Sequence, residues 1–129
     1  NDLRTAAHTL TITGDCPTDT VCFHAQQCAE KYLKALLTRR QTPFPKVHSL
    51  TALVALLPAR ARPSISGAEQ ERLTDYSVVA RYPGEYEPIS RTEARHAVAI
   101  ARRVRREVRR WLPLRARRRK KTGATRSTA

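Results

Sequence analysis

The chain has 129 residues, a formal net charge of +14, 40% hydrophobic residues and 5% aromatic residues. This length suits one small domain, and no stretch approaches the roughly 18 uninterrupted apolar residues of a membrane span. The start carries no basic and then apolar secretion signal, so we expect a cytoplasmic protein with no membrane partner. The three cysteines stand at spacings of six, which fits neither a disulfide framework nor a zinc site; we therefore expect reduced thiols, no metal and no cofactor.

Apolar residues at helical spacing predict five helices and no strand. The first is predicted over residues 2–11, with Leu3, Ala6, Ala7 and Leu10 as its apolar stripe. The second begins after Pro17, with Thr18 or Asp19 as its N-cap, and continues to about Arg40.

The third helix is predicted over residues 49–57, between the prolines at 43 and 45 and the proline at 58. The fourth begins at the capping box Ser66 to Glu69, with Leu73, Tyr76, Val79 and Ala80 inward. Ser90 to Glu93 is a second capping box, which opens a fifth helix. Its inward residues are predicted to be Ala94, Ala97, Val98, Ala101, Val104, Val108, Trp111 and Leu112.

Five helices with short links favour an all-α, up-and-down helical bundle over residues 1–113. Residues 114–129 contain too few apolar residues to fold alone, so we predict a basic, flexible tail. Residues 102–129 hold 13 Lys or Arg and one Glu, and this density is typical of a surface that binds nucleic-acid phosphates. The tail residues expected to do so are Arg115, Arg117, Arg118, Arg119, Lys120 and Lys121. The alternatives are an acidic partner, an anionic membrane surface or a solvated, disordered end.

Three segments stand in a characteristic order: CFHAQQCAEKYLKALL at 22–37, PKVHSL at 45–50 and ARYPGEY at 80–86. With the long final helix they resemble the HEPN family, and within it the bacterial and archaeal proteins similar to the C-terminal domain of sacsin. The resemblance covers roughly residues 2–112. It implies a helical bundle that commonly forms a homodimer. It also implies a separately encoded minimal nucleotidyltransferase as partner, in a pair that resembles a toxin and its antitoxin.

The polar edge of the second helix is the first candidate binding site. His24, Gln27, Lys31 and Lys34 lie on one strip of that helix, and such side chains can pair with a phosphate. An ordinary solvated helix edge is the alternative. The resemblance adds His48, Arg81 and Tyr82 as ligand-binding candidates, although His48 and Tyr82 could also serve local structure.

Arg91 and His96 match the Arg-x(4–6)-His motif of ribonuclease members of the family. The imidazole would act as a general acid or base toward a 2′-hydroxyl, and Arg91 would stabilise charge on the phosphate. Five residues on one helix separate two side chains by about 140°, so a monomer would not bring them together. We therefore expect a protein that binds nucleotide or RNA, with a metal-independent ribonuclease toxin and a protein-interaction module as the alternatives.

Overall fold

The structure, a computed structural model, describes residues 2–10, 17–77 and 88–113. Its elements are α1 (Asp2–Leu10), α2 (Thr18–Arg39), α3 (Leu50–Ala55), the 3₁₀ turn η1 (Ala59–Ala61), α4 (Gly67–Asp75) and α5 (Arg91–Arg109). No strand occurs in these ranges. The prediction of an all-α bundle of about five helices is therefore confirmed. Arg81, Tyr82, Val79, Ala80 and the tail beyond Pro113 lie outside the described residues.

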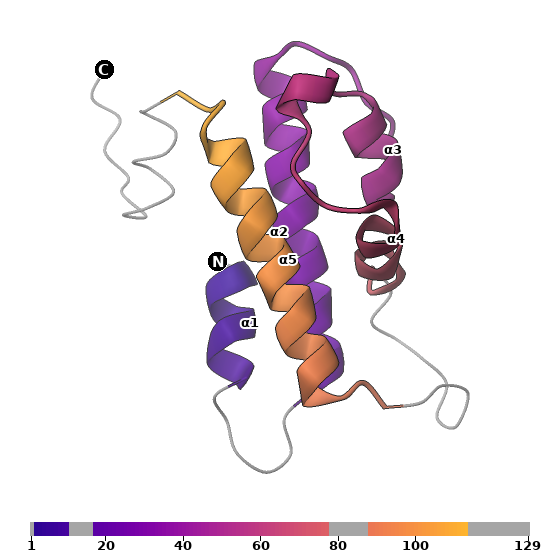
Figure 1. The fold of residues 1–129 in the computed structure, drawn as a ribbon, viewed down its shortest axis with the longest axis vertical. Helices are drawn as coiled ribbons and strands as arrows, with labels where there is room; N and C mark the ends of the chain where they lie inside the picture. Colours follow the sequence, from indigo (N-terminus) through magenta and orange to yellow (C-terminus); the bar gives the residue numbers. More distant parts are fainter. Residues whose placement is uncertain (1, 11–16, 78–87, 114–129) are drawn as a thin grey trace.

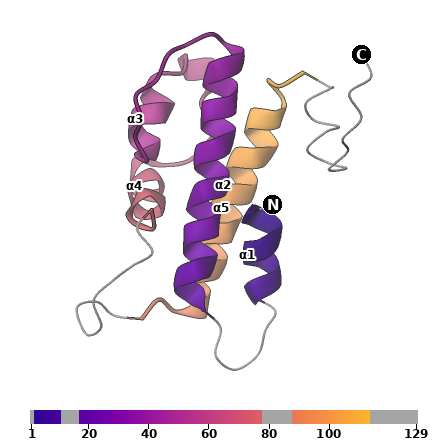
Figure 2. The same cartoon turned by 180° about the vertical axis from the view of Figure 1, so that it is seen from behind.

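The two longest helices, α2 and α5, lie side by side and run in the same direction (Figures 1 and 2). Their first turns meet at one end, where the Thr18 hydroxyl donates to the Ile89 carbonyl at 2.6 Å. Helix α1 covers one side of this pair, and α3 and α4 cover the other (Figure 1). The outer edge of α2 and the outer face of α5 therefore belong to different surfaces of the bundle.

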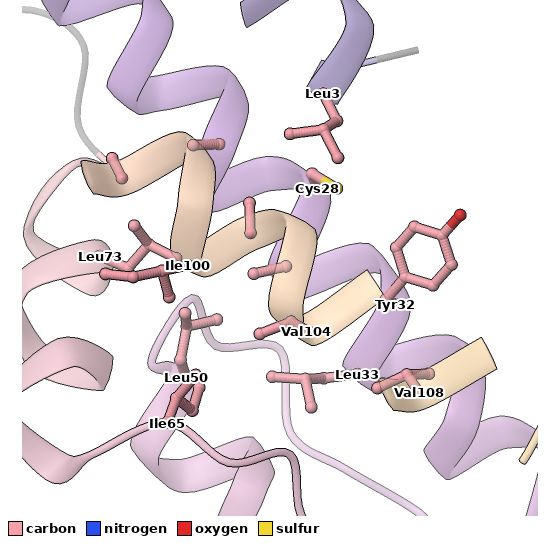
Figure 3. Close-up of a cluster of buried hydrophobic side chains, with 14 of the residues drawn as sticks. Leu3, Cys28, Tyr32, Leu33, Leu50, Ile65, Leu73, Ile100, Val104 and Val108 are labelled. Atoms are coloured by element: carbon pink, nitrogen blue, oxygen red, sulfur yellow. The ribbon is translucent and has the colours of Figure 1, made fainter. Parts of the chain in front are cut away.

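The core forms where the apolar stripes of the helices meet (Figure 3). Leu33 and Leu36 of α2 and Ile100 and Val104 of α5 are fully buried. Leucines 50, 53 and 73 close the core from α3 and α4. Because every turn of α2 and α5 contributes apolar area, burial rather than intrinsic propensity is the main source of helix stability here.

The observed helix ends confirm some of the predicted caps and contradict others. The capping box of Ser66 and Glu69 is present with both of its hydrogen bonds. The N-cap of α2 is Pro17, whose side chain has no hydrogen-bond acceptor, and the Thr18 hydroxyl donates to Ile89 instead; the prediction of a Thr18 or Asp19 cap was wrong. At α5 the Ser90 side chain accepts from the Glu93 N–H as predicted, but the second bond of the predicted capping box is absent, and the Glu93 carboxylate accepts from Tyr76.

One predicted core residue and one helix end also differ. Trp111 is 39% exposed rather than inward, because α5 ends at Arg109 and the chain turns before Leu112 re-enters the core. Helix α4 ends at Asp75, one residue before Tyr76. The Tyr76 side chain is still buried, and its hydroxyl donates to the Glu93 carboxylate.

Candidate functional site

The predicted strip on α2 divides into two carboxylate-centred networks. The first, the Asp2 network, consists of Asp2, His24 and Lys31. His24 Nδ1 lies 2.9 Å from Asp2 Oδ1, and Lys31 Nζ donates to Asp2 Oδ2 at 2.6 Å. Burial by itself raises the pKa of Asp2, but hydrogen bonds from Lys31 and His24 outweigh it, so this pKa is lowered. The Asp2 network thus fastens the start of α1 to the middle of α2.

The second, the Glu30 network, consists of Gln26, Gln27, Glu30, Lys34 and His48. Glu30 Oε1 lies 2.8 Å from Gln26 Nε2 and 2.9 Å from His48 Nδ1, and Glu30 Oε2 accepts from Lys34 Nζ at 2.8 Å. Gln26 also donates to the His48 carbonyl and accepts from Gln27. Gln26 is fully buried, and each of its polar atoms has a partner.

Glu30 remains ionised in this environment. Burial raises its pKa, but hydrogen bonds from Lys34, Gln26 and His48 outweigh that effect, so the pKa of Glu30 is lowered. A carboxylate only accepts hydrogen bonds, so the facing Nδ1 of His48 must carry a proton. The neutral imidazole therefore has its lone pair on Nε2.

His48 and Lys34 are the basic groups of this network that reach the surface. The side chain of His48 is 63% exposed and that of Lys34 is 26% exposed, whereas that of Glu30 is 9% exposed. Lys34 Nζ also lies 5.7 Å from the centre of the Phe44 ring. A buried acid thus holds two basic groups at the surface, in fixed positions on α2 and on the segment before α3.

Arg91 and His96 do not come together within one chain. Arg91 is the first residue of α5 and is half-buried, whereas His96 is exposed one and a half turns further on. A hollow beside the start of α5 is lined by described residues from 68 to 93 that include Glu71, Asp75 and Glu93, and neither Arg91 nor His96 is one of them. Any joint action of these two residues needs a second copy of the chain.

Three members of the two networks were not predicted: Asp2, Gln26 and Glu30. The spacing of Glu30 and Lys34 is that of a helical ion pair, so this contact could have been found in the sequence. Asp2 is 22 residues from His24 and 29 from Lys31, and no local pattern indicates such a contact.

The cysteines, the possible metal ligands and the helix lengths of the described residues bear on three of the sequence predictions. Cys22 and Cys28 are buried thiols outside any disulfide. No group of three or more His, Cys, Asp or Glu side chains suited to a metal ion occurs among the residues described. None of the described helices combines the length and apolar character needed to cross a membrane.

Comparison with known proteins identifies one family. The model of the HEPN domain matches residues 1–111, which covers α1 to α5. No curated protein and no solved structure matches the chain. The match spans far more than half of the sequence and agrees with the helical bundle, so this chain belongs to the HEPN domain family.

Proposed function

We propose that this HEPN protein binds the phosphate group of a nucleotide at the Glu30 network. The observation that carries the proposal is the pair His48 and Lys34, held at the surface by one buried carboxylate. Lys34 has further ammonium protons for phosphate oxygens, and His48 would donate from Nε2 in its imidazolium form, since Nδ1 already faces Glu30. Hydrogen bonds between ionised groups are stronger than neutral ones. His24 and Lys31 belong to the neighbouring Asp2 network and would extend the site along the same helix edge.

The charge balance of the site limits its attraction for an anion. Glu30 and Lys34 form an ion pair, so their charges largely cancel. Recognition of a phosphate would therefore depend on directed hydrogen bonds from Lys34 and His48 more than on net charge.

Calorimetric titration with ATP at pH 6 and pH 8 tests the proposal. His48→Gln should weaken binding about tenfold, because one hydrogen bond to the phosphate is lost. His8→Gln, which alters an exposed histidine on α1, is the matched control and should behave as wild type. Equal affinities of the His48→Gln variant and wild type at both pH values would refute the site.

We further propose that the protein acts with a separately encoded minimal nucleotidyltransferase, in a pair that resembles a toxin and its antitoxin. The support is membership of the HEPN family together with the nucleotide site proposed above. Co-expression and co-purification of the two proteins would test the pairing. Complex formation without any nucleotide affinity would instead favour a protein-interaction module.

A metal-independent ribonuclease is the second candidate, because Arg91 and His96 stand on the first turns of α5, with His96 exposed to a second copy. RNA cleavage in the presence of EDTA should be lost in Arg91→Ala and in His96→Ala. If one homodimer completes the site across its two-fold axis, mixing the two variants should restore about a quarter of wild-type activity. Cleavage that persists in His96→Ala would exclude this assignment.

A further inference from the structure

The outer face of α5 carries a dense group of positive charges. Five side chains from the last two and a half turns line one open groove, which we call the arginine groove: Arg102, Arg105, Arg106, Arg109 and Arg110. The opposite face of the same turns holds Ala101, Val104 and Val108, which are fully buried in the core. The groove therefore lies on the outer side of α5, and its edge reaches α2, where Arg105 and Arg109 approach the Tyr32 hydroxyl.

The nearby carboxylates are engaged elsewhere. Glu69 pairs with Arg103 at 3.0 Å, and Glu107 accepts from the Ser64 backbone N–H at 2.7 Å. Ion pairs among the described residues involve Asp2, Glu30 and Glu69, and none of them includes an arginine of the groove. Five guanidinium groups thus share one surface with no acidic residue among the lining that the structure describes.

The lysines of α2 differ from the arginines of the groove. Lys31 and Lys34 each contact a carboxylate at 2.6 and 2.8 Å, so most of their field is cancelled locally. The groove keeps its full positive field, which concentrates anions near the surface. Arginine also presents several N–H donors in a planar fork that fits two phosphate oxygens at once.

The groove is long enough for several phosphates. Eight residue steps separate Arg102 from Arg110, which is about 12 Å along a helix. Successive phosphates of a nucleic-acid strand follow one another at intervals shorter than this length, so more than one of them would pass the groove. No aromatic side chain is among its described lining residues, so base stacking has no obvious platform.

We infer that the arginine groove binds the phosphodiester backbone of a nucleic-acid strand without reading its bases. The described lining has no apolar residue of the kind that forms the centre of a protein interface or inserts into lipid. This surface is separate from the proposed nucleotide site, so either can fail without the other.

The test uses the full chain and fluorescent 12-nucleotide strands at several salt concentrations. Arg102→Gln with Arg106→Gln removes two exposed charges from the groove, and Arg60→Gln with Arg72→Gln removes two exposed charges elsewhere. Each phosphate contact in a single strand contributes about 0.7 to the slope of log affinity against log salt. The groove variant should lose about 1.4 of that slope and, at 0.1 M salt, about 25-fold in affinity.

The control variant should lose less than a third of that slope, and both variants should melt at the wild-type temperature. RNA and DNA strands of equal length should bind alike. A groove variant that binds as tightly as the control would overturn the inference. So would a more than tenfold preference for RNA over DNA, or binding of polyglutamate as tight as that of the strands.

Discussion

Glu30→Gln tests whether the Glu30 network stabilises the fold. The substitution keeps the shape of the side chain and one carbonyl oxygen, which can still accept from Gln26 and His48. It replaces the oxygen that faces Lys34 with an amide that donates, so two donors then point at one another. Hydrogen bonds to charged groups contribute about 1.5–3 kcal/mol, and we expect a loss of about 2 kcal/mol in the free energy of unfolding.

Removal of a buried charge can stabilise a protein when its partners are removed as well. That does not apply here, because Gln26 is fully buried and cannot turn its amide to water. Glu30→Leu should therefore cost more than Glu30→Gln, about 3–4 kcal/mol, since it removes the acceptor that three donors share and leaves Nε2 of buried Gln26 with only its 3.3 Å bond to the His48 carbonyl.

Urea unfolding followed by circular dichroism measures both variants. Glu71→Gln is the matched control, because Glu71 is exposed on α4, and it should remain within about 0.5 kcal/mol of wild type. The midpoint should shift while the dependence on urea stays constant, since the buried area is unchanged. A Glu30→Gln protein as stable as the Glu71→Gln protein would refute the reasoning.

Further outcomes follow from the described residues. The pKa of Glu30 lies below its ordinary value of 4.5, so the stability that Glu30 contributes is present above that pH and is lost as the pH falls further. In urea unfolding, the free energy of unfolding should therefore fall less steeply toward acid pH in Glu30→Gln than in wild type. Asp2→Asn should loosen α1, which proteolysis or amide exchange near Leu3 would detect, while exchange in α5 stays slow. Gln41 adopts a φ of 56°, which favours glycine, so Gln41→Gly should raise the free energy of unfolding by about 0.5–1 kcal/mol in the same assay.

The helices could be predicted because their signals are local. Apolar spacing marks the buried faces of α2 and α5, and the serines before α4 and α5 mark their first turns. The ends were less predictable where tertiary contacts compete. Thr18 donates to Ile89, 71 residues away, rather than capping its own helix. Glu93 accepts from Tyr76, which no local rule anticipates.

The same difference between local signals and tertiary contacts explains which parts of the candidate site could be predicted. The strip of His24, Gln27, Lys31 and Lys34 follows from helical periodicity alone. Its division between two carboxylates depends on Asp2 from α1 and on His48 from the segment before α3. A polar residue at a core position usually counts against a helix assignment, yet Gln26 and Glu30 satisfy one another there and fix His48 in place.

The two proposed anion sites lie on different faces of the α2–α5 pair. The arginine groove follows the outer turns of α5 and reaches α2 only beside Tyr32, whereas His48 precedes α3 and contacts Glu30 of α2. One phosphate cannot contact both. Unless α2 itself changes position, ATP and a nucleic-acid strand should bind independently, with no coupling free energy between them. A change in strand affinity on saturation with ATP would mean that the rigid core between the sites has a second arrangement, because coupling requires an element whose equilibrium both ligands shift.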